Sequence, residues 1–473
     1  MTDLALNPVT DAFFAKLREG LPEAAFREAS DAYLTEPRGK YRGKGVVIAP
    51  ATTEEVAFVV KVCAKARVGI VPHSGGTGLV GGQVMPEGPT PVVLSLARMN
   101  RIRGTYPAEN ALVAEAGVIL ADVQSAAAAI GRLFPLSLAS EGSARIGGLL
   151  ATNAGGVNVL RYGNARAQCL GLEVVLADGS IWNGLTRLRK DNTGYDLRDL
   201  MIGSEGSLGI ITAATLILAP RPRSVATALL SVGSPDDALN LLMLAQERLG
   251  QTISAFELLS RMGFDFMTET GVGAPCPIAG GPEWMVLAEI GLSSETGAEE
   301  AMMGLFEAAL EAGLAQDGVI ASSEAQRAAL WKMREEIPEA NRRIGAVSSH
   351  DTSVPLSAIP EFIDRARAAI EAIGPYRINC FGHLGDGNLH YNVYPPKSET
   401  KSAHAPRQRE IQTAVHDIVH ALGGSFSAEH GIGRLKVDDL ERYGDPVKLA
   451  TMRAIKQALD PKGILNPGVV LAP

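Results

Sequence analysis

Cysteine is scarce in this 473-residue chain, and its four cysteines, at positions 63, 169, 276 and 380, stand far apart. That spacing argues against a cysteine-rich zinc module, a cysteine-ligated iron–sulfur cluster and a disulfide framework. Aromatic residues make up only 5% of the chain, and no apolar run reaches the roughly 18 residues of a membrane-spanning helix. The 44 basic residues are outnumbered by 52 acidic ones, so nucleic-acid binding is not expected.

The first residues carry neither the basic nor the apolar stretch of a secretory signal, so the expected location is cytoplasmic. The chain is longer than the roughly 250–300 residues at which a single hydrophobic core stops growing, which predicts at least two domains. Glycine, in contrast, is abundant, with 51 residues that gather in clusters.

The first glycine cluster follows a predicted β-α-β unit over residues 44–72. Gly76-x-Gly78-x-x-Gly81 matches the dinucleotide-binding pattern of a Rossmann fold, but that fold needs a helix to open at the third glycine. The chain continues instead through Gln83–Pro89, a poor helix, and no acidic residue follows the next strand. We therefore expect a loop whose backbone N–H groups can surround an anion; the alternative is a surface loop rich in turns.

Two further clusters, over residues 140–156 and 203–212, lie in the same half of the chain. Three segments of small residues suggest a long ligand that lies against the backbone, although close packing of neighbouring backbones explains either of these two equally well. Pro220-Arg221-Pro222-Arg223 then predicts a domain boundary. Beyond it, strands near 225–231, 284–290 and 318–321 alternate with helices near 235–249 and 296–312, which indicates an α+β layer of the ferredoxin-like kind.

Seven of the eight histidines lie between residues 350 and 430. His383 and His390 flank a Gly-Asp-Gly-Asn turn between two strand-like runs, and Glu429 follows later. Two imidazoles and one carboxylate suit a catalytic zinc or another divalent ion; the alternative is that the histidines are satisfied by polar turns. His416 and His420 have the spacing of a zinc-protease helix, but no suitable third ligand follows, so we reject that interpretation.

Three segments carry a resemblance: P-H-S-G-G-T-G-L from Pro72, S-E-G-S-A-R-I-G-G-L-L-A-T-N-A-G-G from Ser140, and I-G-S-E-G-S-L-G-I-I-T from Ile202. They resemble the FAD domain of the vanillyl-alcohol-oxidase type. With the histidine motifs, the chain from about residue 40 onward resembles the D-2-hydroxyacid dehydrogenase group of that superfamily, which acts on acids such as D-2-hydroxyglutarate, D-lactate and glycolate. The resemblance implies an α+β fold, in which a two-part FAD-binding domain carries a ferredoxin-like cap.

The expected division of the chain is an N-terminal helical segment (1–40), the FAD domain (41–222), a substrate domain with the metal ligands (223–422) and a closing C-terminal segment (423–473). The FAD contacts that the resemblance implies are Pro72, Ser74, Gly75, Gly76, Thr77, Gly78, Ser140, Gly142, Gly147, Ala151, Asn153, Glu205, Gly206, Ile210 and Asn466. Some relatives bind flavin covalently through a histidine after the paired glycines of the first loop. This chain has Thr77 there, so we expect non-covalent FAD.

The resemblance also implies metal ligation by His383, His390 and Glu429, with His430 as the base and a further contact to substrate. Asn392 is expected to contact the substrate, and Arg334 to bind its carboxylate through two parallel hydrogen bonds. Hydroxyglutarate enzymes add a Thr and a Lys, where this chain has Pro338 and Ser349, so the particular hydroxyacid stays open.

The expected function is FAD- and metal-dependent oxidation of a D-2-hydroxyacid. Because no cysteine cluster is present, electrons are expected to leave to an electron-transfer flavoprotein, a quinone or another carrier. The expected assembly is a homodimer. The alternatives are the FAD subunit of a glycolate- or D-lactate-oxidising complex with a separate iron–sulfur partner, and an oxygen-using oxidase.

Overall fold

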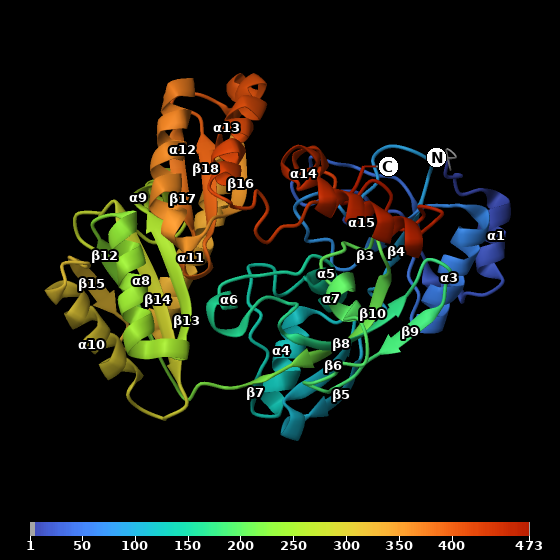
Figure 1. Ribbon diagram of the computed structural model, residues 1–473, viewed down its shortest axis with the longest axis horizontal. Coiled ribbons are helices and arrows are strands. Elements are labelled where there is room, and N and C mark those ends of the chain that lie inside the picture. The colour runs from blue at the N-terminus through green and yellow to red at the C-terminus, as the bar shows by residue number, and fades with distance from the viewer. Residues whose placement is uncertain (1–4, 473) are drawn as a thin grey trace. The chain divides into compact units, whose positions relative to one another are not determined.

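The computed structural model describes residues 5–472 and divides them into two compact units (Figure 1). The first unit holds the residues up to Gly155, then Asn164–Pro220, and finally the C-terminal segment from His430. The second unit holds Gly156–Gly163 and Arg221–Glu429. The chain therefore changes units at 220/221, next to the expected boundary, and again at 429/430. The short segment 156–163 joins the second unit, which no sequence signal indicated.

A small sheet in the first unit has the order β1-β2-β4-β3, with β2, β4 and β3 parallel. The unit formed by β2, α3 and β3 is the predicted β-α-β, and the Thr52 side chain caps α3 by accepting the N–H of Glu55. The elements of this part are α1 (Asp11–Arg18), η1 (Glu23–Ala25), β1 (Phe26–Arg27), α2 (Asp31–Leu34), β2 (Val46–Ile48), α3 (Thr53–Ala66), β3 (Ile70–His73) and β4 (Val92–Ser95).

A second sheet in this unit is antiparallel, with the order β5-β6-β10-β8-β9. A hairpin turns at Asp178-Gly179, across which Val175 pairs with Ile181. The elements are β5 (Ile102–Tyr106), η2 (Pro107–Glu109), β6 (Ala111–Glu115), α4 (Leu120–Ala129), β7 (Arg132–Leu133), α5 (Ile146–Ala151), β8 (Cys169–Val175), β9 (Ile181–Gly184), α7 (Leu197–Met201), β10 (Ile210–Ile217) and β11 (Ala219–Pro220), which pairs with β7.

The C-terminal helices α14 (Val437–Tyr443) and α15 (Pro446–Leu459) belong to the same unit. Ile455 and Leu459 of α15 pack against the core of the antiparallel sheet, while Ile464 and Leu465 enter the core of the parallel sheet. Backbone bonds between Ile70 and residues 464 and 466 fix this last segment beside β3. The end of the chain therefore helps to build the surface around the first glycine loop.

The second unit is built on a seven-stranded antiparallel sheet with the order β15-β12-β14-β13-β17-β18-β16. Its first four strands, with α8 and α10, follow the expected β-α-β-β-α-β order of the ferredoxin-like fold, and α9 is an additional helix between the second and third strands. The elements are β12 (Ser224–Val232), α8 (Pro235–Leu249), η3 (Gly250–Thr252), β13 (Ile253–Ser260), α9 (Arg261–Thr270), β14 (Trp284–Leu292), α10 (Ala298–Glu311) and β15 (Asp317–Ile320).

Three more strands widen this sheet beyond the ferredoxin-like core. The remaining elements of the unit are α6 (Val159–Tyr162), α11 (Glu324–Ile344), β16 (Ser348–Ser353), η4 (Leu356–Ala358), α12 (Ile359–Ile373), β17 (Arg377–His383), η5 (Leu384–Asp386), β18 (Asn388–Tyr394), η6 (Lys401–Arg407) and α13 (Gln408–Ala421).

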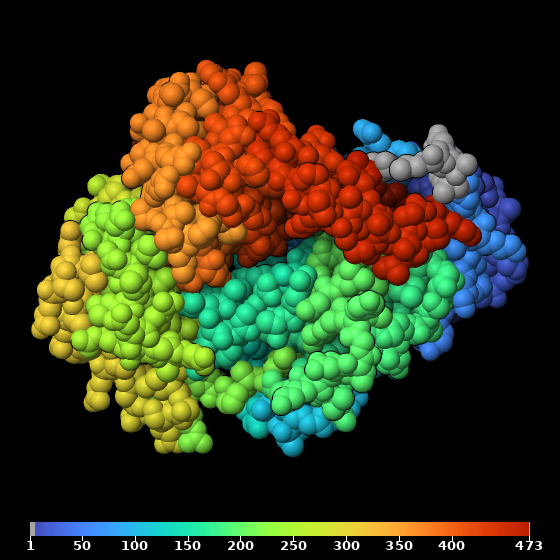
Figure 2. Space-filling view, in the orientation of Figure 1, coloured from blue at the N-terminus to red at the C-terminus, as the bar shows by residue number. Residues whose placement is uncertain are grey.

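Helices cover both faces of this sheet. On one face α8, α10, α12 and α13 pack into a large apolar core, and their outer surface is visible in Figure 2 with α12 and α13 in orange. On the other face α9 and α11 cover a smaller apolar core. Strand register places Glu257, His383 and His390 on this second face, because successive side chains of a strand alternate between faces.

Candidate active site

The predicted histidine pair lies on one hairpin of the second unit. In the β17–β18 ladder Phe381 is opposite His390, and His383 is opposite Asn388. The two histidines are therefore diagonal neighbours on the same face, with ring centroids 5.6 Å apart. The turn between them uses Gly387 at φ +81°, where a Cβ would lie 2.4 Å from the Val354 carbonyl oxygen. Only glycine fits that turn without displacing the backbone beside it.

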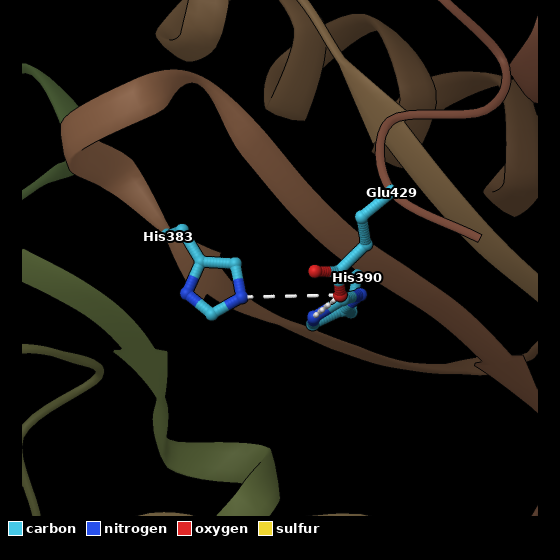
Figure 3. Close-up of side chains that lie close together, drawn as sticks. All are labelled: His383, His390 and Glu429. Carbon is cyan, nitrogen blue, oxygen red and sulfur yellow. Dashed lines mark ion pairs between the residues drawn. The ribbon is translucent and has the colours of Figure 1, made fainter. Parts of the chain in front are cut away.

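Three atoms converge near the turn end of this hairpin (Figure 3). The Nε2 atoms of His390 and His383 lie 3.7 Å and 3.9 Å from one Glu429 carboxylate oxygen, Oε1. One ligand atom from each of the three residues falls within 4.8 Å of the others. Zinc bonds of about 2.1 Å place the ligand atoms of a tetrahedral site about 3.4 Å apart. The three ligand atoms would therefore need to move only slightly closer together to bind one ion. These three residues fit a divalent metal.

Two neighbours in the second unit hold Glu429, one through its side chain and one through its backbone. Its other oxygen, Oε2, accepts the backbone N–H of Gly156 at 3.0 Å. Its own N–H donates to Asp351 Oδ2 at 3.1 Å, and Asp351 Oδ1 accepts the amide of Asn388 at 3.0 Å. These contacts fix the carboxylate with Oε1 directed to the histidines.

Behind His383 lies Glu257, a buried residue at the centre of β13. Its Oε1 is 2.6 Å from His383 Nδ1. Burial alone would lower the pKa of His383, but the Glu257 carboxylate outweighs burial and raises that pKa to about 9. Burial lowers the pKa of His390 to about 4, so this second imidazole is neutral. The sequence interpretation missed Glu257, although a lone acidic residue inside the apolar run Ile253–Ser260 was a usable signal.

Arg334, on α11, is buried, with 6% of its surface exposed, whereas a single arginine on a helix is usually solvated. Its Nε donates a hydrogen bond to Glu257 Oε2 at 2.9 Å, and its Nη2 forms an ion pair with the same oxygen at 2.8 Å. The guanidinium lies 4.9 Å from the centre of the Phe381 ring. Asn392 is also buried, and its Oδ1 accepts the backbone N–H of His350 at 3.2 Å. Both predicted substrate contacts thus lie in the second unit with defined partners.

The expected base, His430, directly follows Glu429 and is the first residue of the C-terminal segment of the first unit. His416 and His420 lie on α13, which packs into the larger core of the second unit, and the buried His416 ring faces His350 at 5.2 Å. Among residues 5–472, neither His416 nor His420 belongs to a group of three potential metal ligands. The structure therefore gives no support to a protease-like zinc site.

The first glycine loop of the first unit follows β3 directly, and residues 77–91 contain no helix. Gly75 and Gly76 adopt φ +89° and +70°, and Gln83 bonds the carbonyl oxygens of Gly76 and Gly78 at 3.2 Å and 2.7 Å. This is the glycine loop that we expected in place of a Rossmann turn. His73 is the last residue of β3, and its buried ring fills the space beside Gly76.

The second cluster packs against this loop backbone to backbone. A Cβ on Gly148 would lie 2.4 Å from the Ser74 carbonyl oxygen, and one on Gly147 would lie 2.7 Å from the Ala116 side chain. The Ser74 hydroxyl donates to the Ala116 carbonyl at 3.0 Å. Gly142 differs, because a Cβ there would meet no atom within 4 Å. Close packing therefore accounts for Gly147 and Gly148, and Gly142 borders open space.

The remaining predicted FAD contacts have varied surroundings. Asn153, at φ +52°, follows α5 and accepts the backbone N–H of Arg166 at 2.9 Å, while Ala151 accepts the N–H of Glu205. A Cβ on Gly206 would lie 2.7 Å from Pro72, so the third cluster contacts β3. The Ile210 side chain is a core residue rather than a surface one. Ser140 and Thr77 are partly exposed in their loops.

Glu205 and Asn466 tie the third cluster to the end of the chain. The Asn466 amide donates to the carbonyl oxygens of Glu205 and Gly82 at 2.8 Å and 2.9 Å. The Glu205 carboxylate accepts the N–H groups of Ile432 and Gly433. All three glycine clusters and the C-terminal segment thus meet around β3, and backbone exposed by small residues there suits a long, flat cofactor.

Comparisons with known proteins agree with these features. Residues 45–184 match the family model "FAD binding domain", and residues 221–470 match "FAD linked oxidases, C-terminal domain". D-2-hydroxyglutarate dehydrogenase of Bos taurus is 39% identical over 89% of this chain and 76% of its own length. The enzyme of the same name from Xanthomonas citri pv. viticola is 38% identical over 89% and 87%. A D-2-hydroxyglutarate–pyruvate transhydrogenase of Saccharomyces cerevisiae is 32% identical over 90% and 87%.

Solved structures agree on the fold. p-Cresol methylhydroxylase with bound substrate superimposes with a TM-score of 0.76 at 18% identity, over 98% of both chains. Alkyldihydroxyacetonephosphate synthase gives 0.72 at 16% identity, over 99% of this chain and 86% of the other.

The fold, the glycine-lined surface and the matched domains define an FAD-linked oxidoreductase of the vanillyl-alcohol-oxidase type. Within that class, the chain belongs to the family of FAD-dependent D-2-hydroxyacid dehydrogenases that includes the D-2-hydroxyglutarate dehydrogenases. No helix among residues 5–472 combines the length and apolar character that crossing a membrane requires.

Proposed function

We propose that this chain oxidises a D-2-hydroxyacid to the 2-oxoacid with non-covalent FAD and a divalent cation held by His383, His390 and Glu429. The observation that carries the proposal is the convergence of two imidazole nitrogens and one carboxylate oxygen near the turn of the β17–β18 hairpin. Two nitrogen ligands and one oxygen ligand leave coordination positions for a substrate, as in catalytic zinc sites.

The charges of the second unit favour a cation at this place. Glu257 is balanced by Arg334, but Glu429 and Asp351 add two carboxylates within 4 Å of the histidines. An anionic substrate would be repelled by such a site. A divalent cation would cancel these two negative charges and would offer a hydroxyacid a positive ion to bind.

Each group has one role in the proposed reaction. FAD supplies the acceptor for the hydride from the substrate Cα, and the cation supplies positive charge that lowers the pKa of the substrate hydroxyl. His430 accepts the hydroxyl proton, a role that suits an imidazole near neutral pH. Arg334 and Asn392 orient the acid through its carboxylate and oxygen atoms.

D-2-Hydroxyglutarate is the first substrate to test, because several relatives at 32–39% identity carry its name. Two positions of the chain indicate that a broader panel of hydroxyacids should be tested. Pro338 stands one helical turn after Arg334, and Ser349 is exposed on β16 opposite Asn392. Neither side chain can supply the positive charge that would bind a second carboxylate, so D-lactate and other monocarboxylic acids belong in the panel.

The electrons are proposed to leave to an electron-transfer flavoprotein, a quinone or another carrier. Three of the four cysteines are buried and none is paired, so they do not form a cluster that could relay electrons. The name of the yeast relative describes transfer to pyruvate, which makes a 2-oxoacid a further acceptor to include. The assembly is proposed to be a homodimer.

The test is anaerobic reduction of the flavin. Bleaching is expected with some D-2-hydroxyacids and not with their L-enantiomers. Chelation of the metal, or His430→Ala, should abolish bleaching and leave FAD bound, whereas His404→Ala is the matched control because His404 pairs with Glu399 on the surface. Normal reduction of the chelated protein would refute the metal role, and a protein that releases no flavin on denaturation would refute the proposal as a whole.

A further inference from the structure

Glu257 contacts two residues of the proposed site at once. It sits between Phe256 and Leu258 in a strand whose eight residues are all buried. One carboxylate oxygen lies 2.6 Å from His383 Nδ1. The other accepts a hydrogen bond from Arg334 Nε and forms an ion pair with Arg334 Nη2. A buried carboxylate destabilises the fold unless it is paired. Its presence at the centre of this buried strand therefore needs an explanation.

We infer that Glu257 is a positioning residue that orients His383 toward the metal and Arg334 toward the substrate; the inference rests on the proposed function. An ionised carboxylate only accepts hydrogen bonds, and an imidazole that binds a metal through one nitrogen is neutral and keeps one N–H, on its other nitrogen. The contact to Oε1 therefore places that hydrogen on Nδ1 of His383 and leaves the lone pair on Nε2. Nε2 is the atom that faces Glu429 Oε1 at 3.9 Å.

The arrangement is that of a carboxylate–histidine–metal triad, in which the outer carboxylate fixes the ring and makes it a better ligand. The corresponding contact behind His390 is looser, because Asp351 Oδ1 lies 4.0 Å from Nδ1. Glu257 is therefore the stronger of the two supports. Because its second oxygen holds Arg334, one carboxylate sets the distance between the metal ligand and the proposed substrate clamp.

The experiment measures zinc affinity of the FAD-loaded full chain by competition with a chromogenic chelator, with Zn²⁺ alone as the probe. Glu257→Gln is expected to weaken zinc binding at least about tenfold, the usual effect of removing such a support. Glu289→Gln is the matched control, since Glu289 lies on the neighbouring strand and bonds Trp331 and Thr227 instead. Its zinc affinity should equal that of the unsubstituted protein.

A double-mutant cycle separates positioning from a general structural effect. If Glu257 acts through His383, Glu257→Gln should weaken zinc binding no further in a His383→Ala background. The same substitution should raise KM for the hydroxyacid through the loss of Arg334 orientation. If Glu257→Gln alone fails to fold, Glu257→Gln with Arg334→Met removes the uncompensated buried cation and keeps the zinc measurement possible.

The outcomes distinguish a failure of this inference about Glu257 from a failure of the proposed metal-dependent function. Unchanged zinc affinity in a Glu257→Gln protein that holds FAD normally would overturn the inference and leave the proposed function intact. Additive weakening in the His383→Ala background would also overturn it, since Glu257 would then act independently of that ring. Failure of the unsubstituted protein to hold zinc or another divalent ion would overturn the proposed metal role, and the inference with it.

Discussion

The carboxylate of Glu205 accepts the backbone N–H of Ile432 at 2.7 Å, although the two residues are 227 positions apart. Its second oxygen accepts the N–H of Gly433 at 2.9 Å. The family resemblance implied Glu205 as a cofactor contact, and these two bonds go to the segment directly after His430. Within the first unit, Glu205 therefore anchors the proposed base to the glycine clusters.

The first prediction concerns the pH dependence of this anchor. Burial raises the pKa of Glu205 to about 7, although the two backbone N–H groups partly oppose it. The folded protein thus holds this proton more tightly than the unfolded chain does. The resulting stabilisation is complete below about pH 4.5 and is lost as the pH rises through about 7, with a total of roughly 3 kcal/mol.

Thermal unfolding of FAD-free protein between about pH 5 and about pH 8 checks this sign. Glu205→Gln cannot ionise, so its melting temperature should fall less over that range than that of the unsubstituted protein. Glu55→Gln is a suitable control, because Glu55 caps α3 in the same unit and is only partly buried. Parallel pH profiles for Glu205→Gln and the unsubstituted protein would contradict the prediction.

A second prediction separates packing glycines from cofactor glycines. Gly148→Ala would force a Cβ to 2.4 Å from the Ser74 carbonyl oxygen, whereas a Cβ at position 142 meets nothing within 4 Å. Gly148→Ala should therefore lower the stability of the FAD-free protein by about 1–3 kcal/mol. Gly142→Ala should leave that stability unchanged and weaken FAD binding, if the space beside it receives the cofactor.

Unfolding of the FAD-free protein and flavin fluorescence titration provide the two readouts. The pair is informative because both glycines belong to one motif and carry the same substitution. Equal loss of stability in the two variants would contradict the structural distinction, and normal FAD affinity of Gly142→Ala would remove Gly142 from the cofactor site.

The third prediction concerns Asn466, whose amide donates to the carbonyl oxygens of Glu205 and Gly82. An aspartate accepts hydrogen bonds only, so Asn466→Asp loses both bonds and should destabilise the first unit by about 1–3 kcal/mol. Asn110→Asp is the matched control. Asn110 also has a left-handed backbone conformation, at φ +49°, but its side-chain oxygen accepts a hydrogen bond from Arg132, which an aspartate can also do. Equal melting temperatures of the two variants would contradict the proposed role of the amide.

Local signals in the sequence predicted the parts of the site that lie close together along the chain. His383 and His390 belong to one hairpin, so a turn motif was enough to place them on one face. The β-α-β unit before the glycine loop followed from helix periodicity and a capping box. For such segments, spacing along the chain determines spacing in the fold.

Glu257 and Asp351 could not be placed in this way. Each is a single carboxylate in its strand, and Glu257 is separated from His383 by 126 residues. Their partners depend on the register between β13 and β17 and between β16 and β18, which is fixed by the packing of both faces of the sheet. The sequence also could not separate Gly147 and Gly148 from Gly142, because close packing and ligand contact favour the same residue.

The last prediction concerns the choice of hydroxyacid. Ser349 pairs with Asn392 across β16 and β18 and is exposed, so a longer side chain at position 349 extends beside the proposed substrate contact without displacing core residues. Ser349→Lys adds a positive charge there, which favours a second carboxylate on the substrate. We expect the ratio of kcat/KM for D-2-hydroxyglutarate to that for D-lactate to rise about tenfold, equal to about 1.4 kcal/mol.

Ser294→Lys, in an exposed loop of the same unit, should leave the ratio unchanged. An unchanged ratio in Ser349→Lys would show that position 349 does not face the distal end of the substrate, and an equal rise in both variants would attribute the effect to net charge alone.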